Sequence, residues 1–256
     1  MQLATAPAAI LVDSISFLVS VISLLLIHAP EPPLPASHLR KSMWHDIGEG
    51  LEVVLRNPVL RSIAGCTATS NLFGNIIFAV FVLYATRELG IAPGPLGLIF
   101  SVGSIGALVG AVVAGRAARQ LGLGPALIGS ILLGGAPMLM IPLAAGSPLV
   151  VMLLLTAAYF LASVGSPIYN INQVSLRQAI TPDSVQGRMN ATMRFIVWGT
   201  IPVGSLIGGA LGSTIGLRET LFVGAIGSVL PVLWLVLSPV RALREQPQPV
   251  AGTAAD

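Results

Sequence analysis

Long apolar segments alternate with short polar ones along most of the chain. The first apolar segment covers residues 7–28, and the later ones are approximately Leu60–Thr86, Pro95–Ala118, Gly124–Ala145, Pro148–Arg177, Met189–Ile215 and Glu219–Ser238. An α-helix needs about 20 mainly apolar residues to cross the hydrocarbon core of a bilayer. The pattern therefore predicts an all-α, polytopic membrane protein with about seven transmembrane helices.

The segment between the first and second apolar runs has a different pattern. After the proline-rich residues 29–35, the apolar positions follow a helical period and are Met43, Trp44, Ile47, Leu51, Val54 and Leu55. The opposite face carries His45, Asp46, Glu49, Glu52 and Arg56. This pattern predicts an amphipathic helix that lies flat on the membrane surface, and the alternative is a helix packed on a soluble partner.

Four regions follow from these patterns. Residues 1–28 are predicted to be a single transmembrane helix, and residues 29–58 a cytoplasmic linker that contains the amphipathic helix. Residues 59–240 are predicted to form a six-helix transmembrane bundle. Residues 241–256 are polar and contain prolines, which predicts a disordered cytoplasmic tail.

The charges agree with a membrane protein and give it an orientation. Hydrophobic residues make up 54% of the chain and charged residues only 9%, far below the roughly 25% of soluble domains. With the spans alternating in direction, eleven of the thirteen basic residues fall on one side. The positive-inside rule makes that side cytoplasmic. We therefore expect a multi-pass protein of the cell (plasma or inner) membrane, with a cytoplasmic C-terminus and an outside N-terminus.

Reactive chemistry has little support in the sequence. Cys66 is the single cysteine, and the three histidines are scattered, so neither a disulfide within the chain nor a metal site is indicated. Nucleophile–base spacing and phosphate-binding glycine loops are also missing. The sequence predicts a protein that is not an enzyme and that uses no cofactor and no metal.

Polar residues inside two of the apolar segments fall on single helical faces. One stripe has steps of three and four and consists of Tyr159, Ser163, Ser166, Asn170, Gln173 and Arg177. The other has steps of four and consists of Thr67, Asn71 and Asn75. Such groups are costly in contact with hydrocarbon, so each stripe should face a neighbouring helix or a water-filled cavity. The simpler alternative is that they are only interhelical hydrogen bonds.

Asp13 is an acidic residue well inside a predicted span. An unpaired carboxylate is costly there, so it should be protonated or partnered. Two roles are open for it, a proton-coupling site or a structural hydrogen bond to a neighbouring helix end.

Glycines and prolines within the spans predict close packing and helix breaks. GxxxG spacing occurs at Gly106–Gly110 and in the register of Gly204, Gly208 and Gly212, which lets helix backbones approach. Prolines inside predicted spans, which should kink or unwind the helix locally, are Pro137, Pro142, Pro167, Pro202 and Pro231.

A polar, charged segment at 170–194 separates two of the longest apolar runs. Within it, Thr181 is predicted to be an N-cap, Pro182 the first helical residue and Asp183 an acid near the positive end of the helix dipole, and Gly187 is predicted to end that turn. The string RQAITPDSVQGRMNA resembles the cytoplasmic loop between the tenth and eleventh helices of major facilitator superfamily (MFS) transporters. The resemblance is to the drug and siderophore exporter branch, which includes the enterobactin exporter and macrolide efflux proteins. Residues 7–17 resemble the start of the sixth helix in the same branch.

The resemblance implies a C-terminal portion of such a transporter, from the sixth to the twelfth helix, without the first five. It implies efflux of a small amphipathic solute, such as a drug or siderophore, by ion-coupled alternating access. The expected partners are the lipid bilayer, the small-molecule substrate, and the missing N-terminal helices or a second half-transporter, with no nucleic acid. The candidate cavity residues are Asn71, Asn75, Tyr159, Ser163, Ser166 and Asn170. The candidate cytoplasmic gate consists of Arg177, Asp183 and Arg188.

Three other interpretations remain open. The chain could be a truncated transporter fragment that is inactive on its own, a membrane scaffold or assembly subunit, or a membrane-embedded enzyme. A scaffold should not need aligned polar stripes, and an enzyme should show a reactive cluster.

Overall fold

The computed structural model describes residues 6–26, 43–245 and 247, and the chain divides into two units, Met1–Lys41 and Ser42–Asp256. The described part of the first unit is helix α1 (Ala6–Leu25). Three of its serines donate their hydroxyl to the backbone carbonyl four residues earlier, as Ser14 does to Ile10 at 2.8 Å. This back-bonding satisfies the hydroxyls without a partner from another helix.

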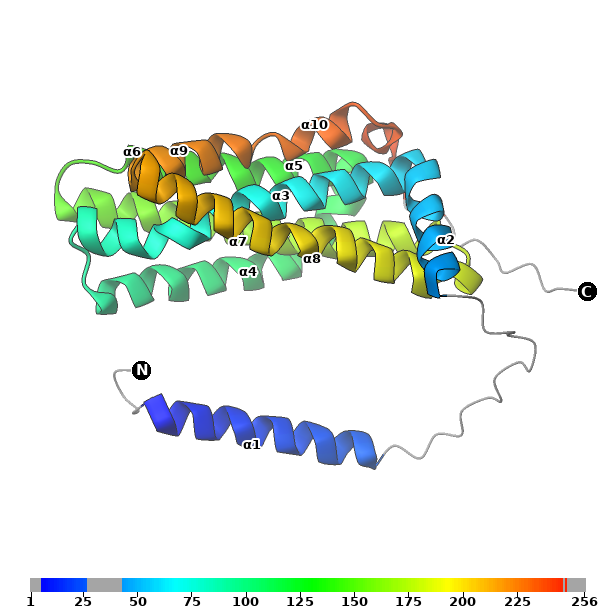
Figure 1. The fold of residues 1–256 in the computed structure, drawn as a ribbon, viewed down its shortest axis with the longest axis horizontal. Coiled ribbons are helices and arrows are strands. Elements are labelled where there is room, and N and C mark those ends of the chain that lie inside the picture. The colour runs from blue at the N-terminus through cyan, green and yellow to red at the C-terminus, as the bar shows by residue number, and fades with distance from the viewer. Residues whose placement is uncertain (1–5, 27–42, 246, 248–256) are drawn as a thin grey trace, which may run out of the picture. The chain divides into compact units, whose positions relative to one another are not determined.

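The second unit is a bundle of antiparallel helices (Figure 1). Its elements are α2 (Met43–Arg56), α3 (Pro58–Leu83), the π-helix η1 (Tyr84–Glu88), α4 (Pro93–Leu121), α5 (Leu123–Gly135), the 3-10 helix η2 (Ala136–Leu139), α6 (Met140–Leu143), α7 (Pro148–Ala179), α8 (Asp183–Thr214), α9 (Leu217–Gly227), α10 (Pro231–Val236) and the 3-10 helix η3 (Pro239–Ala242). The described residues contain no strand, so the predicted all-α class is confirmed.

Six helical segments of the described chain are long and apolar enough to cross a membrane. They are Pro58–Glu88, Pro93–Leu121, Leu123–Leu143, Pro148–Ala179, Asp183–Thr214 and Leu217–Val236. Each overlaps one of the six predicted spans after the linker. Helix α1 contributes a shorter apolar stretch, Asp13–Leu25, so a seventh span at the start of the chain stays a prediction.

Four of the five glycines predicted to allow close packing lie where helix backbones meet, and the fifth, Gly212, lies against the side chain of Val80. Helix α4 packs on α7, and a side chain at Gly106 would stand 2.5 Å from the carbonyl oxygen of Phe160. Helix α8 packs on α3, and a side chain at Gly208 would stand 2.7 Å from the carbonyl oxygen of Ile76. Such approach is possible only without a Cβ, so these positions fix which helices are neighbours.

The prolines predicted to disturb helices act in two ways. The α-helix is interrupted near Pro137, where η2 intervenes, and at Pro231, which begins α10 after a turn. Pro142 lies in the short helix α6. By contrast, α7 and α8 run without interruption through Pro167 and Pro202, so the helix is not unwound at those two positions, and a kink there stays a prediction. Neighbouring helices can satisfy the backbone groups that a proline frees in a membrane span.

Helix α2 crosses one end of the bundle and contacts both α8 and α3 (Figure 1). Val54 is fully buried in this contact, and Gly50 leaves no room for a side chain against the backbone of Arg188. The apolar residues Ile47 and Leu51 remain exposed. The predicted helix is therefore present and is docked on the bundle, and contact of its exposed apolar residues with the membrane surface stays a prediction.

The polar segment between the two long apolar runs forms a tight helical hairpin. Helix α7 ends at Ala179 and α8 begins at Asp183. Thr181 does not cap α8 as predicted, because its hydroxyl donates to the carbonyl of Arg177 at 2.7 Å and so serves the end of α7. Gly187 does not end a turn, because α8 continues through it.

The basic residues of the second unit gather at one end of the bundle. Because the six segments alternate in direction, the starts of α3, α5 and α8 share an end with the last turns of α4, α7 and α10. Backbone hydrogen bonds from Leu123 and Gly124 to the carbonyls of Arg244 and Leu243 join two of these ends. Arg87 and Arg218 lie at the opposite end.

Candidate functional site

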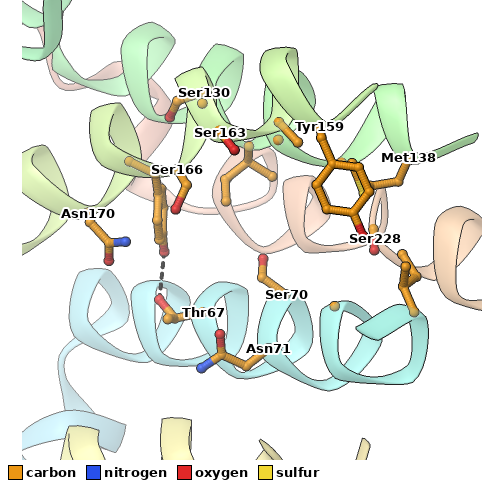
Figure 2. A pocket seen from close by; sticks show the side chains of 18 of the residues that line it. Thr67, Ser70, Asn71, Ser130, Met138, Tyr159, Ser163, Ser166, Asn170 and Ser228 are labelled. Carbon is orange, nitrogen blue, oxygen red and sulfur yellow. Dashed lines mark hydrogen bonds between the residues drawn. The ribbon is translucent and has the colours of Figure 1, made fainter. Parts of the chain in front are cut away.

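A pocket of about 370 Å³ lies inside the bundle, between α3, α5, η2 and α7 (Figure 2). Its polar lining residues are Thr67, Ser70, Asn71, Ser130, Tyr159, Ser163, Ser166, Tyr169, Asn170 and Ser228. The apolar lining includes Ile77, Phe78 and Met138. None of the described lining side chains carries a formal charge, so the pocket offers hydroxyl and amide groups among aromatic and aliphatic surface.

The α7 wall of the pocket is the predicted polar stripe. Figure 2 shows Ser163, Ser166 and Asn170 facing α3 across the pocket. None of these three side chains makes a hydrogen bond within the described part of the chain. Polar groups in a membrane span need a partner, so water or a ligand must supply one here.

The α3 wall is partly used for packing. The Thr67 hydroxyl lies 2.8 Å from the Tyr169 hydroxyl of α7. Asn71 lines the pocket, but its amide nitrogen donates to the carbonyl of Val197 on α8 at 3.2 Å. Asn75 is not among the lining residues, and its amide nitrogen donates to the carbonyl of Asn71 at 2.8 Å. The predicted second stripe therefore provides both pocket surface and interhelical hydrogen bonds, and a cavity role for Asn75 stays a prediction.

Tyr159, one of the residues that line the pocket, belongs to an aromatic cluster. Its ring centroid lies 4.7 Å from that of Phe81 on α3 and 5.3 Å from that of Phe100 on α4, with nearly perpendicular rings in the second pair. Edge-to-face pairs of this kind are favourable and hold the rings in place. The Tyr159 hydroxyl makes no hydrogen bond within the described chain, which leaves it available to a ligand.

Beyond the pocket, the α7 stripe continues into a more enclosed region. Gln173 is buried, and its Oε1 has no hydrogen-bond partner in the described chain. The same holds for Nε of Arg177, one turn later. Both residues lie toward the end of the bundle that collects the basic residues, as the sequence predicted.

The three predicted gate residues, Arg177, Asp183 and Arg188, lie at that end. Two of them contact other residues there. Nη1 of Arg188 contacts Oε1 of Glu49 on α2 at 2.7 Å. Oδ1 of Asp183 accepts a hydrogen bond from Nε2 of Gln186 at 3.4 Å. An interaction of Asp183 with Arg177 or Arg188 in another state stays a prediction.

Several residues of the site were not singled out from the sequence. Tyr169 and Ser70 lie beside the two stripes, whereas Ser130 on α5 and Ser228 after α9 come from helices without a polar stripe. Asn172 is also off the α7 stripe, and it donates to the carbonyl of Ala114 on α4 at 3.2 Å. Isolated hydroxyls and an amide in apolar runs are the only sequence signal for these positions, and that signal does not specify which helix they face.

The remaining candidate residues lie outside the pocket lining. Asp13 is exposed on α1, in the first unit, and its proton-coupling role stays a prediction. Cys66 is buried on α3 as a free thiol. Over the part of the chain that the structure describes, no group of three or more His, Cys, Asp or Glu side chains could hold a metal ion.

The fold and the pocket together define a multi-pass helical membrane protein with a polar cavity inside its bundle. Comparison with known families matches residues 63–254 to the Major Facilitator Superfamily, and the chain belongs to this family. It is also similar to the multidrug efflux pump Tap of Mycolicibacterium fortuitum, with 25% identity over 206 residues, which cover 77% of this chain and 49% of that pump. The chain therefore spans about half the length of this curated relative, and the family predicted from the sequence is confirmed.

Proposed function

We propose that the chain forms part of an efflux transporter for a small amphipathic solute, with the pocket between α3 and α7 as its share of the substrate site. The observation that carries this proposal is the set of α7 side chains Ser163, Ser166 and Asn170, which face the pocket without hydrogen-bond partners among the described residues. They could satisfy a solute's polar groups while Phe78 and Met138 contact its apolar part. A volume of about 370 Å³ lies within the range of about 300–1,000 Å³ usual for ligand pockets.

Membership of the Major Facilitator Superfamily and similarity to a multidrug efflux pump support export. In this proposal the protein lies in the cell membrane with a cytoplasmic C-terminus, because the basic residues gather at one end of the bundle. Transport occurs by rocking of two bundles around a site near the midplane and is coupled to an ion, for which Asp13 is a candidate proton carrier.

The proposal includes a partner for this chain. Ser166 and Asn170 are exposed although they lie in a candidate span, and their polar groups would be costly in contact with lipid. Further helices, either N-terminal helices outside this sequence or a second half-transporter, would complete the cavity wall. If the chain is instead an inactive fragment, it should not transport even when the additional helices are present. The two hypotheses therefore differ only in the result obtained with the partner.

Liposome transport tests both points. The purified chain is reconstituted with and without a co-expressed fragment of five helices from a related exporter, and uptake of a panel of dyes and drugs is measured. We expect concentration-driven transport only with the fragment. Transport by a demonstrated monomer of this chain alone would overturn the partner requirement, and no transport in either case would favour the inactive fragment.

The pocket is tested in the active assembly. Ser166→Leu places an apolar side chain in the pocket and should reduce transport about tenfold or more, because the proposed polar contact with the solute is replaced by steric overlap. Ser104→Leu is the matched control, because Ser104 is an exposed residue of α4 whose hydroxyl bonds its own helix at Phe100. Equal transport by the two variants would contradict the assignment of this pocket.

A further inference from the structure

A second hollow lies on the outside of the bundle, between the first turns of α3 and helix α10. It is a groove of about 520 Å³, and its lining includes Arg61, Thr69, Leu230, Leu233, Trp234 and Leu237. Its residues are distinct from those of the pocket described above. The solute site therefore does not explain it.

The floor of the groove is built around Trp234. The indole lies against Gly65, where a side chain would stand 2.6 Å from the ring. The indole nitrogen donates to the Thr69 hydroxyl at 3.1 Å, which fixes the ring orientation. Leu233 and Trp234 are about half exposed, and Leu237 is 81% exposed, so this apolar surface is open on a helix that belongs to a candidate span.

The end of the groove carries a free cation. Arg61 is exposed, and its guanidinium makes no hydrogen bond or ion pair within the described part of the chain. Arg61, Gly65 and Thr69 follow each other at steps of four, so the guanidinium extends along the same helix face as the indole, toward the start of α3. Arg61 lies in the first turn of the span Pro58–Glu88, and Trp234 in the last turn of the span Leu217–Val236.

Arg61 therefore lies near the membrane interface, and the indole of Trp234, against Gly65 and Thr69, lies one to two helical turns deeper. A guanidinium at the interface matches the phosphate of a lipid in charge and geometry, and the deeper indole offers an apolar surface. The adjoining leucines match an acyl chain. An anionic headgroup should bind at Arg61 more strongly than a zwitterionic one, because it carries no positive group that would offset the attraction of its phosphate to the guanidinium.

We propose that this groove binds an anionic phospholipid, with its headgroup phosphate on Arg61 and an acyl chain along Leu230, Leu233 and Trp234. The gathering of basic residues at the same end places this lipid in the cytoplasmic leaflet. The site is independent of the proposed solute pocket.

Trp234 is a built-in reporter for the test. The chain has three tryptophans, so Trp44→Phe and Trp198→Phe leave Trp234 as the single fluorophore. The full chain with these changes is reconstituted in phosphatidylcholine vesicles that contain a minor, equal fraction of brominated phosphatidylglycerol or brominated phosphatidylcholine. Bromine quenches indole fluorescence only at close range, so the quenching curves report relative occupancy of the groove.

We expect an occupancy about five-fold higher for the anionic lipid, since one arginine near the surface contributes about that factor. Arg61→Gln should abolish the preference, and Arg61→Lys should retain most of it because the charge remains. Arg119→Gln is the matched control, because Arg119 is another exposed arginine in the last turn of α4 that does not line the groove, and it should leave the preference unchanged.

Three results would overturn the proposal. The first is equal quenching by the two brominated lipids, and the second is a preference that persists in Arg61→Gln. The third is absence of quenching by either lipid, which would show that protein covers the groove. Arg61 is exposed, so its replacement should not prevent folding, and gel filtration of each variant verifies this.

Discussion

The side-chain oxygens of Thr67 on α3 and Tyr169 on α7 lie 2.8 Å apart, in a hydrogen bond that joins the two principal walls of the pocket. Tyr169 is buried, and Thr67 also donates within its own helix to the carbonyl of Ile63. The bond links one residue of the α3 wall directly to one of the α7 wall. Loss of this bond should affect both stability and pocket shape.

Replacing Tyr169 by Phe removes the hydroxyl and little else. We expect the variant to lose about 0.6 kcal/mol of unfolding free energy and at most about 1.7 kcal/mol, the average and the maximum measured for interhelical hydrogen bonds in a membrane protein. The measurement is reversible unfolding in mixed micelles, completed as a double-mutant cycle with Thr67→Val. A coupling energy of zero would show that the two hydroxyls do not stabilise each other. Thr86→Val is the control, because Thr86 is half-buried on η1 and, among the described residues, its hydroxyl bonds only to carbonyls of the preceding turn.

Gly110→Ala should separate α4 from α7. A side chain at Gly110 would overlap the carbonyl oxygen of Val164, and neither backbone can move without shifting a whole helix. We expect a loss of about 1–3 kcal/mol in unfolding free energy, as for overpacked cores. Gly97→Ala is the matched control on the same helix, because an added Cβ there meets no atom within 4 Å. Similar stabilities of the two variants would contradict the packing described here.

Glu49→Gln should loosen α2 from the bundle. The Glu49–Arg188 pair is only 28% exposed on each side, so its charge-assisted bond should contribute about 1–2 kcal/mol. Hydrogen exchange of the α2 amides measures this opening. Glu52→Gln is the control, because Glu52 pairs with Arg56 at the surface, 52% and 83% exposed, and should contribute less than about 0.5 kcal/mol. Equal exchange in both variants would show that the first pair does not hold the helix.

Asp183→Asn tests the proposed cytoplasmic gate in the complete transporter. The change removes the charge and keeps an oxygen that can accept from Gln186. An exposed ion pair contributes about 0–1 kcal/mol, so transport should slow by up to about five-fold while stability stays unchanged. Glu88→Gln, at the opposite end of the bundle, serves as the control. An unchanged transport rate at normal expression would remove the gate.

Membrane topology is tested by cysteine labelling in a Cys66→Ala background. Gln120 lies at the end of α4 that carries Arg116 and Arg119, and Ser147 lies at the opposite end, before α7. Both positions are exposed. We expect a membrane-impermeant reagent to label Ser147→Cys in intact cells and Gln120→Cys only after permeabilisation. Preferential labelling of Gln120→Cys from outside would reverse the orientation.

The sequence by itself determined the all-α class, the six spans after the linker and the polar stripe on α7. These properties depend on local periodicity, because the position of a residue on a helix face follows from its number alone. The GxxxG positions also followed from local spacing, since close backbone approach needs small residues one turn apart.

Only the tertiary structure decided which groups meet. Thr67 and Tyr169 are 102 residues apart, Asn71 and Val197 are 126 apart, and Glu49 and Arg188 are 139 apart. Periodicity gave each of these residues a face, but their partners depend on the order and rotation of packed helices. For this reason the sequence did not show that Asn71 both lines the pocket and donates a hydrogen bond to α8. It also did not show that Glu49 contacts α8, because the helix pattern placed Glu49 on the polar face of α2. Packing of many side chains at once sets helix rotation, and no single stretch of sequence contains that information.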